Sequence, residues 1–510
     1  MMAVCPARIR SILSPETTGC PTAPESPLIH LYLSPHSAAC RVHSFLDPCS
    51  MFLQARLLIV AQEDDLAGPL SEGLDQLGWP TVTARGPYAA EAALSDLGIE
   101  AVVLDLSDGF EEAQVLARRL RELSDPRRIA IVAVGGDAAH VHAGEFDLRL
   151  ALPVQPAQVA MWLDSLVRTA LAEEEHRLRQ ETLADLGVHL KDVEVSDTPL
   201  RILAVGDPNP QFLGLTNSLE ALGARVVGAF TSYSAFDFLH ETEFDTVVLW
   251  GGDAADSAMA IAGGMRRNSR LYHIPTLLYL TSLKGLSAHE AYRRGVFDVA
   301  SPETPEPETA WRALELARSY RRQSSVRSAL EAMRSLKLMD PQTGLFTPEL
   351  FSRHLVRLGA SVPVRNRPMT LCVLRVRESE DLAEADRTGW LEKAFPLLSS
   401  MISRLIRMED SAARIGMDRF AIALPATSED VARTVAERIA AVISRTAFDG
   451  GEGRPPFGLE FDIGAVEVQD PSQVDQALER ACEMSRSEAN RYRTSGREIR
   501  EGFQDQVRSV

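Results

Sequence analysis

The segment Arg56-Leu-Leu-Ile-Val60 is a short apolar run that predicts a buried β-strand. A helical stretch from Leu66 to Leu77 follows it, and two further apolar runs, Thr81–Thr83 and Ala101–Leu104, predict more strands. Strands that alternate with helices indicate a parallel sheet covered by helices. We therefore expect an α/β domain over residues 51–185, in which the regular pattern starts at Met51.

The same layout returns further along the chain. A strand is predicted at Leu200–Val205, a helix at Phe212–Leu222, and further strands at Thr246–Trp250 and Pro275–Tyr279. Self-similar order indicates tandem repeats. The second copy is expected over residues 199–320.

Both copies resemble response-regulator receiver domains, which implies two flavodoxin-like α/β domains. A receiver takes phosphate on an Asp at the end of its third strand and holds Mg²⁺ on acidic residues after the first strand, because this ion prefers oxygen ligands. In the first copy Asp105 stands at the acceptor position, but Ala61-Gln62 replaces the acidic pair. Val134 and Leu152-Pro153 replace two further functional positions. A strand-end or capping Asp is therefore favoured over a phosphoacceptor at Asp105.

The second copy departs further from the receiver pattern. Its acceptor position is Trp250, its acidic pair is Gly206-Asp207, Ser301 precedes Pro302, and only Thr281 matches. Tryptophan offers no acyl oxygen for phosphate. This copy is expected to be a structural or dimerisation module.

Two connections between domains are predicted to be helical. Residues 309–339 place apolar side chains at intervals of three and four, which indicates one helix with a narrow apolar seam. The seam predicts either a homodimer contact or packing on its own domain, and both stay open. The earlier connection, Ala170 to Leu190, is strongly charged and is expected to be a solvated linker.

The last segment, residues 340–510, carries two ordered motifs. It opens with Asp340-Pro-Gln-Thr-Gly-Leu345, and Gly416-Met417-Asp418-Arg419-Phe420 lies downstream in a stretch from Arg414 to Thr427. Together these resemble the diguanylate cyclases, the GGDEF domains, with a broken signature. The resemblance implies an α/β nucleotidyl-cyclase-like fold. In that family, carboxylates at fixed points hold the metal ions that act on GTP.

The positions that such chemistry needs are largely replaced. Arg375 follows the expected strand Met369–Leu374 where the family has a metal-binding Asp, and Met417 and Arg419 replace a Gly and the Glu of the signature. One remaining carboxylate, Asp418, cannot organise two divalent ions. We therefore predict no enzyme activity, no catalytic residue and no cofactor, and a doubtful Mg²⁺ site.

A second motif of the same segment keeps its pattern. Arg407-Met408-Glu409-Asp410 follows an apolar helical stretch, Leu397–Met408, and falls where the family has its RxxD site for cyclic di-GMP. An Arg fork suits the O6 and N7 acceptors of guanine, and a carboxylate suits its N–H donors. The resemblance adds Arg438 as a second arginine. The alternative for the tetrad is a solvated ion pair on a helix surface.

Composition narrows the functional classes. The 510 residues carry a net charge of -18, which argues against nucleic acid and anionic lipid as general partners. The sequence contains no apolar run long enough to span a bilayer, so membrane insertion is not expected. Four of the six cysteines lie in residues 1–50, which read as a disordered leader or a misassigned start. A cytoplasmic protein is predicted.

The order receiver, receiver and degenerate GGDEF resembles the PopA-like cyclic di-GMP receptors. That resemblance implies a non-catalytic adaptor, located at a cell pole, whose protein partners include protease substrates in cell-cycle-regulated proteolysis. Two alternatives stay open. One is a residual diguanylate cyclase or GTP-binding domain that uses Asp418, and the other is a receiver scaffold controlled by phosphorylation of Asp105.

Overall fold

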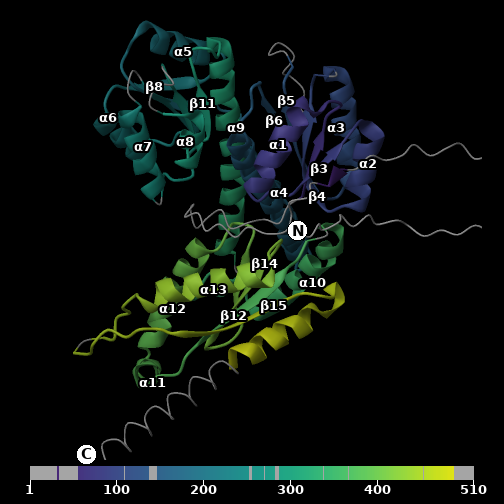
Figure 1. Ribbon diagram of the computed structural model, residues 1–510. Helices are drawn as coiled ribbons and strands as arrows, with labels where there is room; N and C mark the ends of the chain where they lie inside the picture. The colour runs from purple at the N-terminus through teal and green to yellow at the C-terminus, as the bar shows by residue number, and fades with distance from the viewer. Residues whose placement is uncertain are drawn as a thin grey trace, which may run out of the picture.

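The computed structural model describes residues 32–33 and 56–486, apart from residues 108, 137–145, 252–254, 269, 282–285, 337, 366 and 452. Within these residues the chain forms three sheets, each with its own helices. Figure 1 shows the first two domains side by side above the third. Among the first fifty residues only β1, Tyr32–Leu33, is described, so the prediction of a leader lies almost wholly outside the described residues.

The first domain contains the parallel sheet that the sequence predicts. Its strand order is β1-β3-β2-β4-β5-β6, in which β1 is the antiparallel edge strand and the other five run parallel. Without β1 this is the 2-1-3-4-5 order of flavodoxin-like folds. The strands are β2 (Arg56–Val60), β3 (Thr81–Ala84), β4 (Ile99–Asp105), β5 (Ala130–Val134) and β6 (Leu148–Leu150), and the helices are α1 (Asp64–Gln76), α2 (Pro87–Asp96), α3 (Phe110–Ser124) and α4 (Pro156–Ala184).

The apolar run that opens this domain is buried on both faces of the sheet. Side chains alternate along a strand, so Leu57 and Ile59 pack in the cluster that includes α1 and α4 residues. Leu58 and Val60 pack in the cluster that includes α2 and α3 residues. A strand covered on both faces needs a continuous apolar run, which is why this segment could be recognised in the sequence.

The second domain repeats the topology. Its sheet has the order β11-β10-β9-β7-β8, all parallel, which is again 2-1-3-4-5. The strands are β7 (Arg201–Val205), β8 (Arg225–Ala229), β9 (Thr246–Trp250), β10 (Thr276–Tyr279) and β11 (Asp298–Ala300), and the helices are α5 (Pro210–Ala221), α6 (Ser232–Glu241), α7 (Asp256–Arg267), α8 (Ala288–Arg293) and α9 (Glu306–Ala332).

The third domain has a sheet of a different kind. Its order is β13-β14-β12-β15, and all neighbours are antiparallel. The strands are β12 (Thr370–Val376), β13 (Ser411–Arg414), β14 (Arg419–Leu424) and β15 (Phe461–Glu467), and the helices are α10 (Pro348–Arg365), α11 (Glu380–Arg387), α12 (Trp390–Leu405) and α13 (Glu429–Ser444), with one short 3-10 turn, η3 (Pro471–Gln473), before helical residues 474–486.

Two long helices, α4 and α9, extend from the first and second domains and pack against the third. They pack against each other, and α4 also packs against α10. Leu178 and Leu183 of α4 lie in one apolar cluster with Phe351 and Leu355 of α10. The helices therefore belong to two domains at once, and Figure 1 shows α9 running down from the second domain to the third.

The expectation that residues 170–190 form a solvated linker is wrong. Residues 170–184 of this stretch form the second half of α4, and charged side chains within them, among them Glu175 and Arg179, are buried. The error has a physical cause: a charged helix that is buried against polar partners has the same sequence pattern as one that is solvated.

The apolar seam of the other predicted helix packs within this chain. The helix α9 ends at Ala332 and continues as the 3-10 turn η2 (Met333–Ser335). Val326, Leu330 and Met333 lie in one apolar cluster with residues of the third domain. This is the alternative in which the seam packs intramolecularly. Every described helix is too short or too polar to cross a membrane.

Candidate functional site

The broken signature lies at a charged corner of the third sheet. Antiparallel pairing of β12 with β14 sets Arg375 directly opposite Arg419. Two cations in that position repel each other. Asp418 offsets the repulsion, because its Oδ2 lies 2.6 Å from Nη1 of Arg375 and its Oδ1 lies 3.3 Å from Nε of Arg419. Both oxygens of the one remaining signature carboxylate are therefore engaged by arginines.

These residues do not fit the magnesium ions that the GGDEF resemblance implies. Mg²⁺ takes several oxygen ligands in a near-octahedral arrangement. Here a cation, Arg375, replaces one expected carboxylate, and Arg419 replaces another. In the part of the chain that the structure describes, no group of three or more His, Cys, Asp or Glu side chains could hold a metal ion.

The tetrad forms a turn between α12 and β13. The predicted helix runs to Met408, but α12 ends at Leu405 because Ile406 adopts an extended backbone. The N–H of Arg407 donates to Oδ2 of Asp410 at 2.8 Å, and the N–H of Asp410 donates to the carbonyl of Arg407 at 3.3 Å. The two ends of the motif are thus brought together by a turn, rather than by one face of a helix.

Arg438 reaches the same corner from α13. Its Nη2 donates to the carbonyl oxygen of Leu405 at 3.0 Å, at the last turn of α12. A cation in this position complements the carbonyl end of a helix. The structure therefore gathers all three predicted ligand residues, Arg407, Asp410 and Arg438, around the end of α12.

The carboxyl group of Asp410 is unusual. Asp410 is only 4% exposed, and its neighbour Glu409 is 1% exposed. The Oδ1 atom of Asp410 has no hydrogen-bond partner. Burial, with added repulsion from Glu409 and Glu175, raises the pKa of Asp410 to about 8, although Arg407 opposes the shift. Leaving a buried acceptor unpaired costs about 1–3 kcal/mol. Such a group is typical of a functional site.

A cluster from α4 lies against this turn. Nη2 of Arg179 donates to the carbonyl oxygen of Asp410 and to Oγ of Ser411, both at 3.0 Å. Nε of the same guanidinium donates to Oε1 of Glu175 at 2.6 Å. That oxygen also accepts from Ser411 Oγ at 2.6 Å and lies 2.9 Å from Nε2 of His354.

These α4 residues were missed by the sequence analysis. Burial alone would raise the pKa of Glu175, but the charges of His354 and Arg179 and the hydrogen bonds hold it well below its usual value. In the sequence, Glu175 and Arg179 are an ordinary pair four residues apart on a charged helix. Nothing in that spacing marks them as contacts of a turn far along the chain.

Asp105 lies at the carboxyl end of β4, as predicted. Its Oδ1 accepts from the backbone N–H of Ser107 at 2.9 Å and from the Ser107 hydroxyl at 2.6 Å. Val134 is its direct neighbour on β5, and Ala61 is buried after β2. These bonds fit a carboxylate that caps its own turn.

The equivalent position in the second domain is filled by aromatic rings. Trp250, at the end of β9, stacks on Tyr279 with ring centroids 4.1 Å apart. Phe212 of α5 packs edge-on against it at 5.7 Å. The strand ends where a receiver keeps its polar site are therefore occupied by an apolar cluster.

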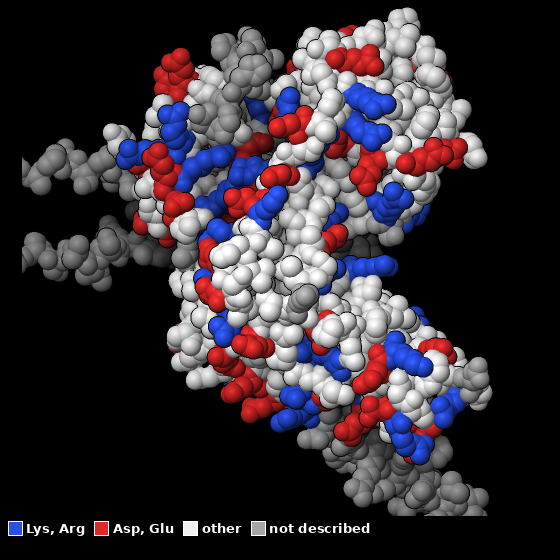
Figure 2. Space-filling model, turned by 180° about the vertical axis from the view of Figure 1, so that it is seen from behind, with Lys and Arg blue, Asp and Glu red and all other residues white. Residues whose placement is uncertain are grey.

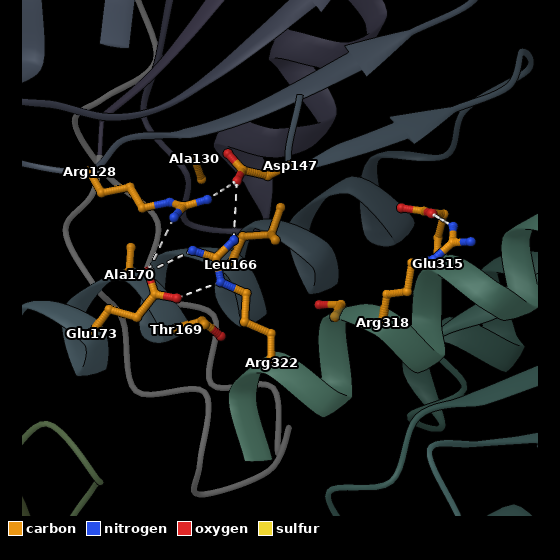
Figure 3. Close-up of a pocket in the computed structure, with 11 residues that line it drawn as sticks. Arg128, Ala130, Asp147, Leu166, Thr169, Ala170, Glu173, Glu315, Arg318 and Arg322 are labelled. Atoms are coloured by element: carbon orange, nitrogen blue, oxygen red, sulfur yellow. Dashed lines mark hydrogen bonds and ion pairs between the residues drawn. The ribbon is translucent and has the colours of Figure 1, made fainter. Parts of the chain in front are cut away.

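A hollow of about 130 Å³ lies next to the first sheet and is lined by residues of both α4 and α9. Figure 3 shows that charged side chains line it and point toward one another. Arg322 of α9 donates to both oxygens of Glu173 on α4, including Oε2 at 2.8 Å, and Arg128 binds Asp147 at 2.8 Å. Because these charges are paired, the hollow is an ion-pair junction between the two helices. Over the face in Figure 2, acidic and basic side chains are likewise interspersed.

Comparison with known proteins identifies the third domain. Residues 337–494 match the family model described as "Diguanylate cyclase, GGDEF domain", so this part of the chain is a GGDEF domain. Most of the chain is similar to Response regulator PleD of Caulobacter vibrioides, with 21% identity over 437 residues, which are 84% of this chain and 95% of PleD. The chain is thus related to response-regulator diguanylate cyclases.

Further relatives and solved structures match a smaller share of the chain. Probable diguanylate cyclase DgcT of Escherichia coli is 25% identical over 168 residues, which are 31% of this chain and 37% of DgcT, so the match spans little more than a third of that relative. Among solved structures, the GGDEF domain of FimX from Pseudomonas aeruginosa is 18% identical and covers 31% of this chain and 96% of its own, with a TM-score of 0.28. The GGDEF domain of DgcB from Caulobacter crescentus, in complex with c-di-GMP, is 21% identical and covers 30% and 90%, with a TM-score of 0.27.

The buried carboxyl of Asp410 predicts a pH-dependent stability. Its pKa is about 8 in the folded protein, above the ordinary value of 3.8 that we take for the unfolded chain. Its contribution is fully present below the unfolded pKa and is lost as the pH rises to about 8. We expect Asp410→Asn to be more stable than the wild type at about pH 8, with a difference that shrinks toward about pH 4. Thermal unfolding across this range measures it.

Asp386→Asn is the matched control, because Asp386 is exposed on α11. This variant should follow the wild-type pH profile. Parallel profiles for Asp410→Asn and the wild type would contradict the assignment of a raised pKa.

Proposed function

We propose that the chain is a non-catalytic receptor for cyclic di-GMP, which binds at Arg407, Asp410 and Arg438 and signals through protein contacts. The observation that carries the proposal is the turn that joins Arg407 to Asp410 and leaves one buried oxygen of Asp410 without a partner. A buried acceptor without a donor is the feature that a ligand with N–H groups would satisfy.

The chemistry of the dinucleotide suits these three side chains. A guanine base offers O6 and N7 as acceptors for the Arg407 fork, and its N1–H and exocyclic amine are donors for Asp410. The phosphates would take Arg438, whose present partner is a helix-end carbonyl. Ionised Asp410 is the better acceptor, so ligand binding would release the proton that burial retains.

The receptor role is supported by the replaced metal site in a domain that matches the GGDEF family. Arg375 and Arg419 engage Asp418 where the active domains of that family use carboxylates. We propose that the two α/β domains are degenerate receiver domains, in keeping with the similarity to PleD over 84% of the chain. They would then act as protein-contact modules of a PopA-like adaptor, with protease-substrate proteins among its partners.

Arg407→Ala tests the binding site directly. Loss of one forked pair to a charged ligand costs about 1.5–3 kcal/mol, so we expect the Kd for cyclic di-GMP to rise more than tenfold. Isothermal titration measures it. Arg404→Ala is the control, because Arg404 is exposed one turn earlier on α12 and should leave the Kd close to the wild-type value. Equal affinity of Arg407→Ala and wild type would refute the site.

The absence of catalysis can be tested with GTP and Mg²⁺. We expect no cyclic di-GMP to form and no magnesium-dependent heat of GTP binding, because arginines engage Asp418. Product formation is followed by chromatography. Turnover that disappears in Asp418→Asn would instead establish a residual cyclase.

The phosphorylation alternative concerns Asp105. Because the Asp105 carboxylate caps the turn at Ser107, and Ala61-Gln62 stands directly after β2 in place of an acidic pair, we expect no labelling by a small phosphodonor. Intact mass of wild type and Asp105→Asn after treatment measures this. A phosphate adduct on the wild type that Asp105→Asn lacks would favour the scaffold function.

A further inference from the structure

The ligand turn is closed by a helix of another domain. The helix α4 begins in the first α/β domain, and its second half lies against the GGDEF domain through Leu178 and Leu183. From this segment Arg179 bonds to the backbone carbonyl of Asp410 and to the hydroxyl of Ser411. Asp410 is 4% exposed, and the charge of Glu175 on the same helix helps to raise the pKa of the Asp410 carboxyl.

We propose that α4 is a gate on the cyclic di-GMP site, such that the docked helix and the bound dinucleotide exclude each other. This inference rests on the proposed function. It follows from access: Oδ1 of Asp410 is buried, and a guanine donor needs to come within hydrogen-bond distance of it. Asp410 and Ser411 belong to the turn and to β13, whereas Arg179 belongs to α4, which begins in the first α/β domain.

The contact is specific enough to act as a latch. Oε1 of Glu175 accepts from Arg179 and Ser411 and lies beside His354, which is fully buried on α10. Arg179 also lies over the ring of Phe346, at 5.2 Å from its centroid. Undocking would break these bonds and expose the apolar contacts of Leu178 and Leu183 to water. The closed form is therefore favoured in the absence of ligand.

With such a gate, docking of α4 and binding of the ligand affect each other reciprocally. If docking of α4 lowers the affinity for the ligand, the ligand lowers the stability of docking by the same factor. The measured Kd then exceeds the intrinsic Kd by the inverse of the fraction that is open. Any substitution that weakens the latch without touching the ligand residues should tighten binding.

The gate also connects the ligand site to both α/β domains. Arg322 of α9 holds Glu173 of α4 at the junction in Figure 3, six residues before Arg179. The side-chain amide of Gln158, in the first turn of α4, donates to Asp298 of β11 at 2.6 Å. Movement of α4 therefore changes the contacts between all three domains, which is how an occupied site would alter the surface offered to a protein partner.

The latch can be tested with Arg179→Met in the full chain. This substitution removes the bonds to Asp410 and Ser411 and keeps an apolar stem, and we expect the Kd for cyclic di-GMP to fall several-fold. Arg179→Lys, which keeps the charge but not the fork, should lie between this variant and the wild type. The control is Arg177→Met on the exposed side of the same helix, where Arg177 pairs with Glu181; its Kd should equal that of the wild type. An unchanged or higher Kd for Arg179→Met overturns the gate.

Hydrogen exchange provides a second readout in the wild-type protein. Addition of cyclic di-GMP should increase amide exchange in residues 171–184 of α4, and protection of that segment by the ligand overturns the gate. Because Arg179→Met leaves Glu175 buried, Glu175→Gln with Arg179→Met removes both charges and serves if the single variant unfolds. The two proposals fail differently. Binding that Arg407→Ala abolishes but Arg179→Met does not tighten refutes the gate alone, whereas no binding by the wild type or by any latch variant refutes both.

Discussion

The arrangement of the domains depends on one buried ion pair, Glu175 with Arg179, and on what it holds. The two side chains pair within α4, and they also bond to Asp410, Ser411 and His354 of the GGDEF domain. Buried ion pairs contribute little net stability, since desolvation offsets their attraction. What they fix is geometry: α4 can satisfy these charges in one register against the turn, and apolar contacts of Leu178 and Leu183 supply the burial.

At the broken signature, arginines also meet a carboxylate, but the carboxylate is left in a different state. There, arginines from adjacent strands converge on Asp418 and engage both of its oxygens. At the tetrad, by contrast, one oxygen of the Asp410 carboxyl is buried without a partner, and the pKa of that carboxyl is raised. Groups with strongly shifted pKa values cluster at functional sites, which makes Asp410 rather than Asp418 the candidate functional carboxyl. This contrast between two corners of one domain is the main physical support for a receptor rather than an enzyme.

The two flavodoxin-like domains share one topology but carry different side chains at the equivalent strand ends. In the first, the strand-end carboxylate caps its own turn. In the second, Trp250 and Tyr279 stack at the equivalent strand ends. Both sheets keep the parallel order that the alternation of strands and helices predicts. The fold depends on buried apolar runs such as Arg56–Val60, and these are independent of the few polar residues at the strand ends.

The sequence by itself determined the local elements and the residue chemistry. Strands covered on both faces need continuous apolar runs, so the two parallel sheets were predictable, and Arg375 and Arg419 could be read directly as cations rather than metal ligands. Arg407 and Asp410 came from the RxxD pattern and Arg438 from the family resemblance, although a turn at the end of α12 replaced the expected helix. Only the tertiary structure decided that Asp410 is buried and that α4 contacts its backbone. Arg179 and Asp410 are 231 residues apart, and a charged helix has the same pattern whether water or another domain satisfies its charges.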